Sequence, residues 1–534
     1  MKCKYLLLGF ALALFMQNSY AQSAFDLYSA SQTDLKGTAR FMSMAGAFGA
    51  LGGDISTLTQ NPGGIGIYRS SDINFSFDWN FQTTKTNGEK LKNDAAFSFN
   101  NFGYVGALKI GNDVMPNFNW GFSYNRLANF NRRYMGTIGN IQNSMSNYVA
   151  GQTNDYGWKA SELGESTSYN PYIDSNAPWM SILAYNSYLI NPLSIEDNFV
   201  GLYQNGTTGF AEFEVEEKGH LDEYTISFGG NIYDILYWGA SVGIQDLEFN
   251  QYTYYGESLN NAFVPYETSQ DGNLAVGNGY TSWGIENSFR MYGTGANFKL
   301  GVILKPVNEL RLGFAFHTPT FFSLKSEAYA STSFMFESNE PNVVNNIRGG
   351  AETDQGYIAE TWFDAQSPWK VMIGAAGVVG GRGLLSFNYE RNMYPSMKVQ
   401  YDGREDRGTT DCVKAYYKAS DIFRIGGEFK LTPQLAVRAG YSYQTSPSTE
   451  EIKSDELNVV TAGTTLSYTT DDNIQYVTAG LGYRFRHFYA DFAYLHKIRN
   501  TTFHAFSPDD FGIAPTAEVK DSNNEIVLSF GFRF

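Results

Sequence analysis

The chain has 534 residues, of which 16% are aromatic and 54 are glycine, and its formal net charge is -16. A surface with this negative balance excludes nucleic acid as a partner, because phosphate backbones are bound by clustered lysine and arginine. With only two cysteines, the chain is not a disulfide-stapled scaffold.

The first 21 residues have the pattern of a secretory signal peptide. Two lysines precede an apolar stretch at 5–15, and the small residues Ser19 and Ala21 occupy the two positions that a signal peptidase reads. This stretch is shorter than the roughly 20 residues of a membrane helix. We expect cleavage after Ala21, which leaves Cys412 as the single cysteine of the mature chain.

Residues 22–71 alternate in neither the strand nor the helix period and are rich in Gly, Ala and Ser. Glycines at positions 46, 49, 52 and 53 would let this backbone approach another one closely. Because the segment runs directly into a membrane strand, we expect it to fold inside a barrel as a plug, called the hatch below. Phe48, Asn61, Pro62 and Gly63 are its expected fixing points and the candidate ligand-site residues.

The two ends of the remaining chain, 72–534, read as neighbouring barrel strands. DINFSFDWNF (72–81) alternates five apolar with five polar residues, and EIVLSFGFRF (525–534) ends in the same pattern at Phe534. A strand whose outer side is wholly apolar requires an apolar solvent there. We expect the Phe534 strand to carry the signal that the barrel-assembly machinery reads.

The number of strands can be derived from the short turns that connect alternating segments. Six such turns are found, at 111–117, 231–236, 305–310, 378–383, 430–434 and 485–488. With both ends periplasmic they join twelve strands, and the first and last strands bring the total to fourteen, an even number as closure requires. We therefore predict an all-β fold, a 14-stranded antiparallel transmembrane β-barrel in the outer membrane of a Gram-negative bacterium. A soluble β-sandwich or propeller would not explain aromatic rows on nearly every strand.

The outer connections are expected to be long loops. They fall at about 128–220, 256–288, 338–367, 395–414, 446–473 and 498–524. The first is too long to lack structure and is expected to carry short helices or a lid. The glutamates at 212, 214, 216 and 217 read as one solvated strand face rather than a cation site. The acidic exterior suits contact with outer-membrane lipid and lipopolysaccharide.

Several arginines alternate with outward apolar residues and are expected to point into the lumen. They are Arg311, Arg424, Arg438, Arg484 and Arg533. We favour their pairing with Glu390, Glu428, Asp491 and hatch carboxylates over the binding of a ligand carboxylate.

No catalytic or metal site is predicted. Gly239–Gly243 matches the GxSxG string of serine hydrolases but lies within a strand, where small lumenal residues explain it. The five histidines lack ligand spacing, which disfavours a haem role. We expect no enzyme activity, no cofactor and no metal, and a lipid hydrolase remains the enzymatic alternative.

Several motifs resemble the long-chain fatty-acid transporter family of outer-membrane barrels, the FadL type. In the hatch, Ala39-Arg40, Ala45 to Phe48, Asp54 and Asn61-Pro62 match the family pattern, and the strands at 311–320, 367–374 and 435–447 follow in the family's order. Two departures are Gly63, where the family has alanine after Asn-Pro, and the longer first outer loop.

The resemblance implies a fourteen-stranded barrel closed by a hatch, with hydrophobic or amphipathic ligands, fatty-acid-like, leaving laterally through the wall without an energy-coupling partner. Three alternatives remain open. A diffusion porin needs no hatch, a surface adhesin or structural barrel would bind partners through its loops, and a haem-related receptor would need ligand histidines.

Overall fold

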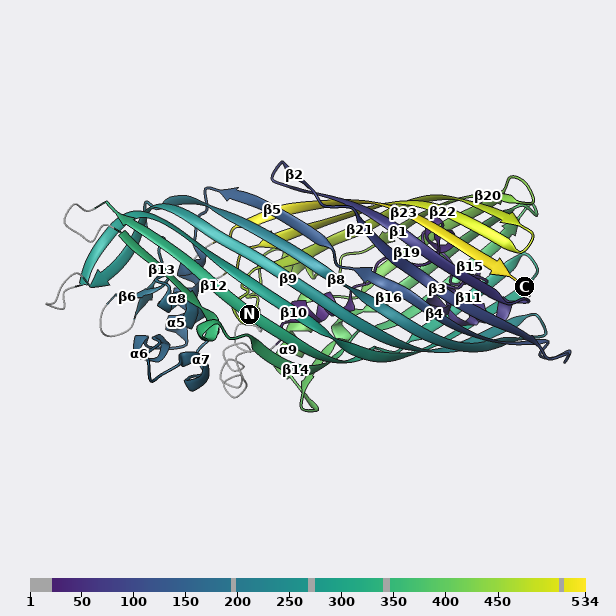
Figure 1. The fold of residues 1–534 in the computed structure, drawn as a ribbon, viewed down its shortest axis with the longest axis horizontal. Helices are drawn as coiled ribbons and strands as arrows, with labels where there is room; N and C mark the ends of the chain where they lie inside the picture. Colours follow the sequence, from purple (N-terminus) through teal and green to yellow (C-terminus); the bar gives the residue numbers. More distant parts are fainter. Residues whose placement is uncertain (1–21, 194–197, 268–273, 340–345, 509–512) are drawn as a thin grey trace.

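The chain forms a closed antiparallel barrel with a helical cap at one end (Figure 1). The computed structural model describes residues 22–193, 198–267, 274–339, 346–508 and 513–534. The expected signal peptide lies outside the described residues. The fourteen strands of the ring are β1 (Asp72–Thr86), β3 (Ala96–Lys109), β4 (Asn117–Asn129), β8 (Thr208–Ile232), β9 (Leu236–Glu267), β10 (Leu274–Val307), β11 (Leu310–His317), β15 (Trp369–Val379), β16 (Gly383–Met393), β19 (Ser420–Lys430), β20 (Leu435–Gln444), β21 (Tyr468–Phe485), β22 (Phe488–His504) and β23 (Thr516–Arg533). The predicted fold class is confirmed.

The ring closes between the first and last strands, as their matched apolar rows predict. β1 and β23 pair from Asp72↔Arg533 to Thr86↔Val519 without a register shift. Outside the ring, the Phe75 and Phe530 side chains lie with ring centroids 5.7 Å apart. The closure leaves neither strand as a free sheet edge, which a barrel in lipid requires.

A belt of exposed apolar side chains surrounds the barrel and faces outward, as the alternation predicts. It includes Phe75, Phe99, Trp120, Ile226, Phe228, Val242, Ile244, Phe298, Leu300, Leu312, Phe314, Ile373, Phe387, Phe423, Ile425, Val477, Leu481, Phe492 and Phe530. The neighbouring positions point inward and carry small or polar side chains such as Ser76, Ser241 and Ser529, all buried. This belt places the barrel in a membrane.

Among the described residues, no helix is long and apolar enough to cross a membrane.

The six predicted short turns are confirmed, each between two consecutive strands of the ring. One runs from Ile232 of β8 to Leu236 of β9, and another from Phe485 of β21 to Phe488 of β22. The chain ends of the barrel lie at this same end, which is therefore periplasmic.

Four outer connections are shorter than predicted, because their flanking strands continue beyond the apolar belt, whereas the connections after β11 (318–368) and β16 (394–419) are longer. Residues 256–288, expected to be a loop, belong mainly to the hairpin of β9 and β10, and β10 alone has 34 residues. After Ile244 the outward-facing residues of β9 are mainly polar. Water can therefore solvate them, while the hydrogen-bonded pairing of β9 with its neighbours continues beyond the membrane. The expected solvated face of four glutamates is also corrected, because alternation turns Glu217 inward to line a lumenal cavity.

Further strands, most of them short, and several helices complete the outer half. The strands are β2 (Glu89–Lys92), β5 (Arg132–Gly139), β6 (Asn191–Pro192), β7 (Phe199–Val200), β12 (Phe321–Ser338), β13 (Asn346–Glu352), β14 (Ala359–Gln366), β17 (Lys398–Tyr401) and β18 (Arg404–Glu405). The helices are α5 (Met145–Asp155), α6 (Ala160–Leu163), α7 (Pro171–Asp174), α8 (Trp179–Asn186), α9 (Arg407–Tyr416) and α10 (Glu450–Lys453), with 3-10 turns η2 (Thr353–Gly356) and η3 (Tyr394–Ser396).

Helices α5 to α8 form the predicted helical structure in the first outer connection, and we call them the lid. They share a buried core with the outer strand extensions that includes Ile182, Phe213 and Phe336. Within this core the Phe213 and Phe503 rings stack with centroids 3.9 Å apart. The lid therefore covers the end of the molecule that lies away from the C-terminus (Figure 1).

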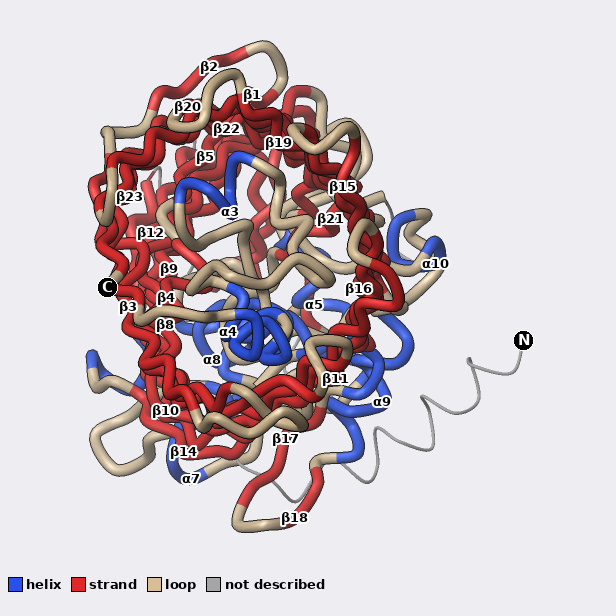
Figure 2. The backbone as a smooth tube through the Cα atoms, turned by 90° about the vertical axis from the view of Figure 1, so that its right-hand side faces the viewer, coloured by secondary structure: helices blue, strands red, loops and turns tan. Residues whose placement is uncertain are grey.

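The hatch lies inside the ring of strands, where Figure 2 shows α3 and α4. It comprises α2 (Ala24–Ser31), α3 (Ala39–Ser43), α4 (Thr57–Gln60) and η1 (Pro62–Ile67). Wall glycines allow the close contact: a Cβ on Gly301 would lie 1.9 Å from Asn61 Oδ1, and one on Gly239 would lie 2.1 Å from the Pro62 carbonyl oxygen. Small wall residues and a glycine-rich hatch thus let two backbones touch.

Candidate functional site

The lumen holds an outer cavity above the hatch, with a volume of about 160 Å³. Its lining includes the aromatic residues Phe25, Phe130, Phe249, Phe289 and Tyr468 and the charged residues Asp34, Arg132, Lys497, Arg499 and Asp521. A ligand in this cavity would contact both apolar and ionic side chains.

A smaller inner cavity of about 120 Å³ lies deeper in the barrel, against the hatch. Its wall carries Glu223, Lys299, His317, Glu390 and Arg424. Thr33 and Asp34 line both cavities, so this part of the hatch is the partition between them. A shift of the 32–36 segment would join the two spaces.

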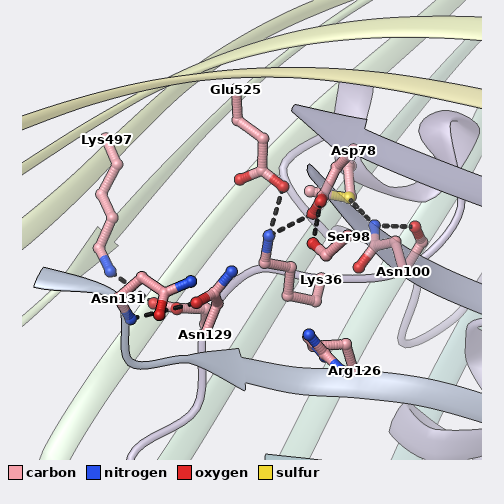
Figure 3. Close-up of polar contacts among 12 residues, drawn as sticks. Lys36, Asp78, Ser98, Asn100, Arg126, Asn129, Asn131, Lys497 and Glu525 are labelled. Atoms are coloured by element: carbon pink, nitrogen blue, oxygen red, sulfur yellow. Dashed lines mark hydrogen bonds and ion pairs between the residues drawn. The ribbon is translucent and has the colours of Figure 1, made fainter. Parts of the chain in front are cut away.

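Lys36 fastens this partition to the wall (Figure 3). Its Nζ lies 2.5 Å from Asp78 Oδ2 of β1 and 2.5 Å from Glu525 Oε1 of β23. The side chains of Lys36, Asp78 and Glu525 are 3%, 0% and 7% exposed. Burial alone would lower the pKa of the Lys36 amine, but Glu525 and Asp78 outweigh it and raise that pKa above its usual range. We call this triad the latch.

A second ionic network joins the hatch to another part of the wall, formed by β16, β19, β20 and β22. Arg40 Nε of the hatch donates to Glu428 Oε2 at 3.1 Å, and Arg438 Nε donates to the same oxygen at 2.7 Å. Arg438 also contacts Asp491 at 2.5 Å, and Arg424 contacts Glu390 at 2.6 Å. Arg424 and Arg438 thus lie against carboxylates that the sequence suggested as their partners.

The other sequence-derived arginines differ in position. Arg311 Nη1 donates to the Leu51 carbonyl of the hatch at 2.6 Å, and Arg533 Nη2 donates to that of Gly53 at 3.3 Å. Arg484 is exposed near the turn between β21 and β22 rather than buried in the lumen. Its strand position has inward parity, but the strand ends there at the periplasmic rim.

The four hatch residues named from the sequence lie buried in two places. Phe48 is 0% exposed and packs on Phe41, with ring centroids 5.3 Å apart. Asn61 accepts a hydrogen bond from Gly63 N at 3.0 Å and donates to the carbonyls of Gly49 and Val302, while Pro62 begins η1. These contacts fix the hatch, and a direct contact with ligand stays a prediction.

The barrel wall contains an interrupted ladder between β3 and β4, which we call the seam. The β3–β4 pairing ends at Asn101↔Asn125, whereas β3 remains paired with β1 up to Ala96. The interruption follows a bulge at Asn100, where the β1–β3 register shifts between Ser76 and Phe77. A bulge adds one residue and bends its strand, which turns this end of β3 away from β4.

The seam is bordered by the hatch, the outer cavity and the apolar belt. The Asn100 side chain donates to the Gly37 carbonyl of the hatch at 2.7 Å. The outer cavity is lined by Asn80 of β1 and by Asn129 at the end of β4, one on each side of the interruption. On the outer surface, Phe97 is 59% exposed. The sequence carries a signal for the seam in the adjacent pair Asn100-Asn101, which breaks the alternation of FSFNNFGY (97–104).

The GxSxG string lies where its sequence context predicts. Ser241 points into the barrel, 2.6 Å from Ser227 Oγ, and donates to the Leu58 carbonyl of the hatch at 3.3 Å. It lies within β9 rather than at a strand-to-helix turn. Within the described part of the chain, no group of three or more His, Cys, Asp or Glu side chains is arranged to hold a metal.

The fold matches a solved structure. A crystal structure of a Pseudomonas aeruginosa FadL homologue aligns with a TM-score of 0.51 and 14% sequence identity, over 95% of this chain and 100% of that chain. The chain has the fold of this FadL homologue. The crystal structures of the P. putida toluene transporter TodX and the Ralstonia pickettii toluene transporter TbuX align over 94% of this chain and 99% of theirs, at 14% identity, with TM-scores of 0.45 and 0.44. No protein-family model and no curated protein sequence matches the chain.

Proposed function

We propose that the protein takes up hydrophobic or amphipathic small molecules, fatty-acid-like in character, by passive diffusion that the hatch gates, with lateral exit through the seam. The ligand enters the outer cavity from the cell surface and leaves between β3 and β4 into the outer leaflet. The observation that carries the proposal is the seam, reached from inside by a cavity and bordered outside by exposed apolar side chains.

The mixed lining of the outer cavity favours an amphipathic ligand. Burial of an alkyl chain against its aromatic side chains contributes about 0.8 kcal/mol per CH2, while a polar headgroup can contact Arg132, Lys497 or Arg499. In lipid the alkyl chain keeps the free energy gained by its removal from water, so the exit step needs no energy source. Water-soluble solutes do not gain this free energy, and the hatch blocks their passage through the lumen.

The seam can be closed by removing one residue. Deletion of Asn100 makes Asn101 follow Phe99 in regular alternation and restores the β1–β3 register, since Ser76 pairs with Asn101 and Phe77 with Phe99. The straightened strand can then pair with β4. We expect the deletion protein to form a heat-modifiable barrel and to lose most uptake of a fluorescent fatty-acid analogue into proteoliposomes.

Asn100→Ala is the matched control. It keeps the extra residue and hence the bulge, and it removes the side-chain contacts to the Gly37 carbonyl and to Met42 Sδ of the hatch. Uptake through this variant should equal or exceed that of the wild type. A folded Asn100 deletion with full uptake would refute exit through the seam, and if no apolar solute is taken up by the wild type, the surface adhesin becomes the better explanation.

A further inference from the structure

Three neighbouring periplasmic turns form a surface that is purely basic, which we call the basic rim. It comprises residues 378–383, 430–434 and 484–488 and contains no Asp or Glu. Its four cations are Arg382, Lys430, Arg484 and Arg486. All four are exposed, and in the described part of the chain none of them forms an ion pair with a carboxylate. Their charge is therefore left for a partner.

Backbone hydrogen bonds hold these turns side by side. The Lys430 N–H donates to the Arg382 carbonyl at 3.0 Å, and the Arg484 N–H donates to the Gln434 carbonyl at 2.9 Å. Neighbouring strands of a sheet lie about 4.8 Å apart, so the six strands from β15 to β22 span about 24 Å. The four cations therefore lie on one continuous stretch of the periplasmic edge.

The other half of the periplasmic edge has a different charge. Each of its three turns contains a carboxylate, namely Asp113, Asp234 and Glu309. Where the hatch leaves the barrel, Arg69 forms an ion pair with Asp234. The chain as a whole has a net charge of -16. The basic rim is thus a local reversal of the charge of the protein, confined to one side of one end.

We propose that the basic rim binds the phosphates of anionic phospholipid in the inner leaflet of the outer membrane. Guanidinium groups bind phosphate oxygens through two parallel hydrogen bonds, and lysine binds them as a point charge. Basic side chains beside a bilayer are attracted to anionic headgroups. A row of four such side chains would gather these lipids on this side of the barrel.

The apolar neighbours of the cations favour lipid over an acidic protein as the partner. In the sequence Lys430 lies between Phe429 and Leu431, and both of these side chains are exposed. The Arg486 guanidinium lies over the Phe485 ring, 5.4 Å from its centroid. Phe485 is 55% exposed and has an outward position on β21. A cation that rests on a lipid-facing ring lies at the level of the headgroups, where basic side chains keep their stems in apolar surroundings.

Native mass spectrometry of the full chain in detergent tests this site. The probes are phosphatidylglycerol, which is anionic, and phosphatidylcholine with the same acyl chains. We expect the wild type to bind phosphatidylglycerol at a concentration at least tenfold lower. Each basic residue near an anionic surface contributes roughly fivefold in affinity, so the double variant Arg484→Gln, Arg486→Gln should lose most of this preference.

The double variant Lys109→Gln, Lys305→Gln is the matched control. It removes the same charge from the half of the periplasmic edge whose turns contain carboxylates, and it should keep the preference for phosphatidylglycerol. Equal losses in the two double variants would show that total charge, rather than the basic rim, determines lipid binding, which would contradict the proposal.

Two measurements on other samples complete the test. If Arg484→Gln, Arg486→Gln fails to form a heat-modifiable barrel, Arg382→Gln, Lys430→Gln should lose the preference in its place. In the wild type the preference should fall at least fivefold between about 0.05 and 0.5 M salt, because salt screens exposed charges. Equal binding of the two lipids by the wild type would overturn the proposal and make an acidic periplasmic protein the better partner.

Discussion

Replacement of Lys36 by methionine should open the hatch, because it removes the cation of the latch and leaves two buried carboxylates facing each other. Asp78 is 0% exposed and Glu525 is 7% exposed, so water screens neither group. Removal of one partner from a buried ion pair costs about 3 to 5 kcal/mol. Protonation of one carboxylate at neutral pH would limit the cost to about 4 kcal/mol, at about 1.4 kcal/mol per pKa unit.

A cost of about 4 kcal/mol corresponds to roughly a thousandfold change in the ratio of displaced to seated hatch. We expect Lys36→Met to show frequent channel openings in planar bilayers under conditions where the wild type is closed. The triple variant Lys36→Met, Asp78→Asn, Glu525→Gln should close again, because it buries no unpaired charge. Lys497→Met is a milder control, since its partner Asp34 is 22% exposed and a single carboxylate.

Closed behaviour of Lys36→Met, with the barrel correctly inserted, would refute the assignment of the latch. Equal leakage through Lys36→Met and the triple variant would show that packing of the lysine chain, rather than its charge, seats the hatch.

Three further predictions follow from other parts of the molecule. Arg438→Ala should loosen the hatch, seen as increased proteolysis near residue 40, without a change in ligand affinity measured by fluorescence titration; altered affinity with a protected hatch would instead assign Arg438 to the ligand. On β9, beneath the first turn of lid helix α5, burial raises the pKa of Glu257 to about 7, although Ser144, the Met145 N–H and Tyr255 donate hydrogen bonds to it. The folded carboxyl therefore keeps its proton at pH values where the unfolded one has lost it, so the lid should lose about 3 kcal/mol of stability between about pH 4.5 and pH 7 and little more above. Hydrogen exchange in α5, corrected for intrinsic rates, should show this loss, and the same loss in Glu257→Gln would contradict it. Deletion of Phe534 should impair insertion, because the terminal aromatic belongs to the outer row and to the signal for assembly; a normal yield of heat-modifiable barrel would count against this role.

The barrel could be predicted because every second side chain of a strand in lipid faces hydrocarbon and must be apolar. Alternation in 72–81 and 525–534 identified the two closing strands, and the turn residues counted the rest. The rule stops at the membrane surface. Beyond Ile244, both sides of β9 can be polar, so the sequence of the strand extension resembles that of a loop.

The latch could not be predicted, since nothing local distinguishes Lys36 from other lysines. Its partners Asp78 and Glu525 lie about 40 and 490 positions further along the chain, and they meet it only after the ring closes around the hatch. The inward position of Arg438 could be predicted, because the alternation of its strand is enough to direct it into the lumen. Arg484 also has an inward strand position, but its strand ends at the periplasmic rim, so the side chain lies outside the lumen. The seam could be predicted only in part, because the adjacent pair Asn100-Asn101 indicates the bulge in β3 but not the missing pairing between β3 and β4.

Deletion of residues 22–60 is the decisive test of hatch-gated transport, with conductance and uptake of a fatty-acid analogue measured on the same reconstituted protein. We expect a stable barrel that conducts ions continuously and no longer takes up the analogue selectively. A deletion protein with wild-type conductance and unchanged uptake of every apolar solute would contradict hatch-gated transport.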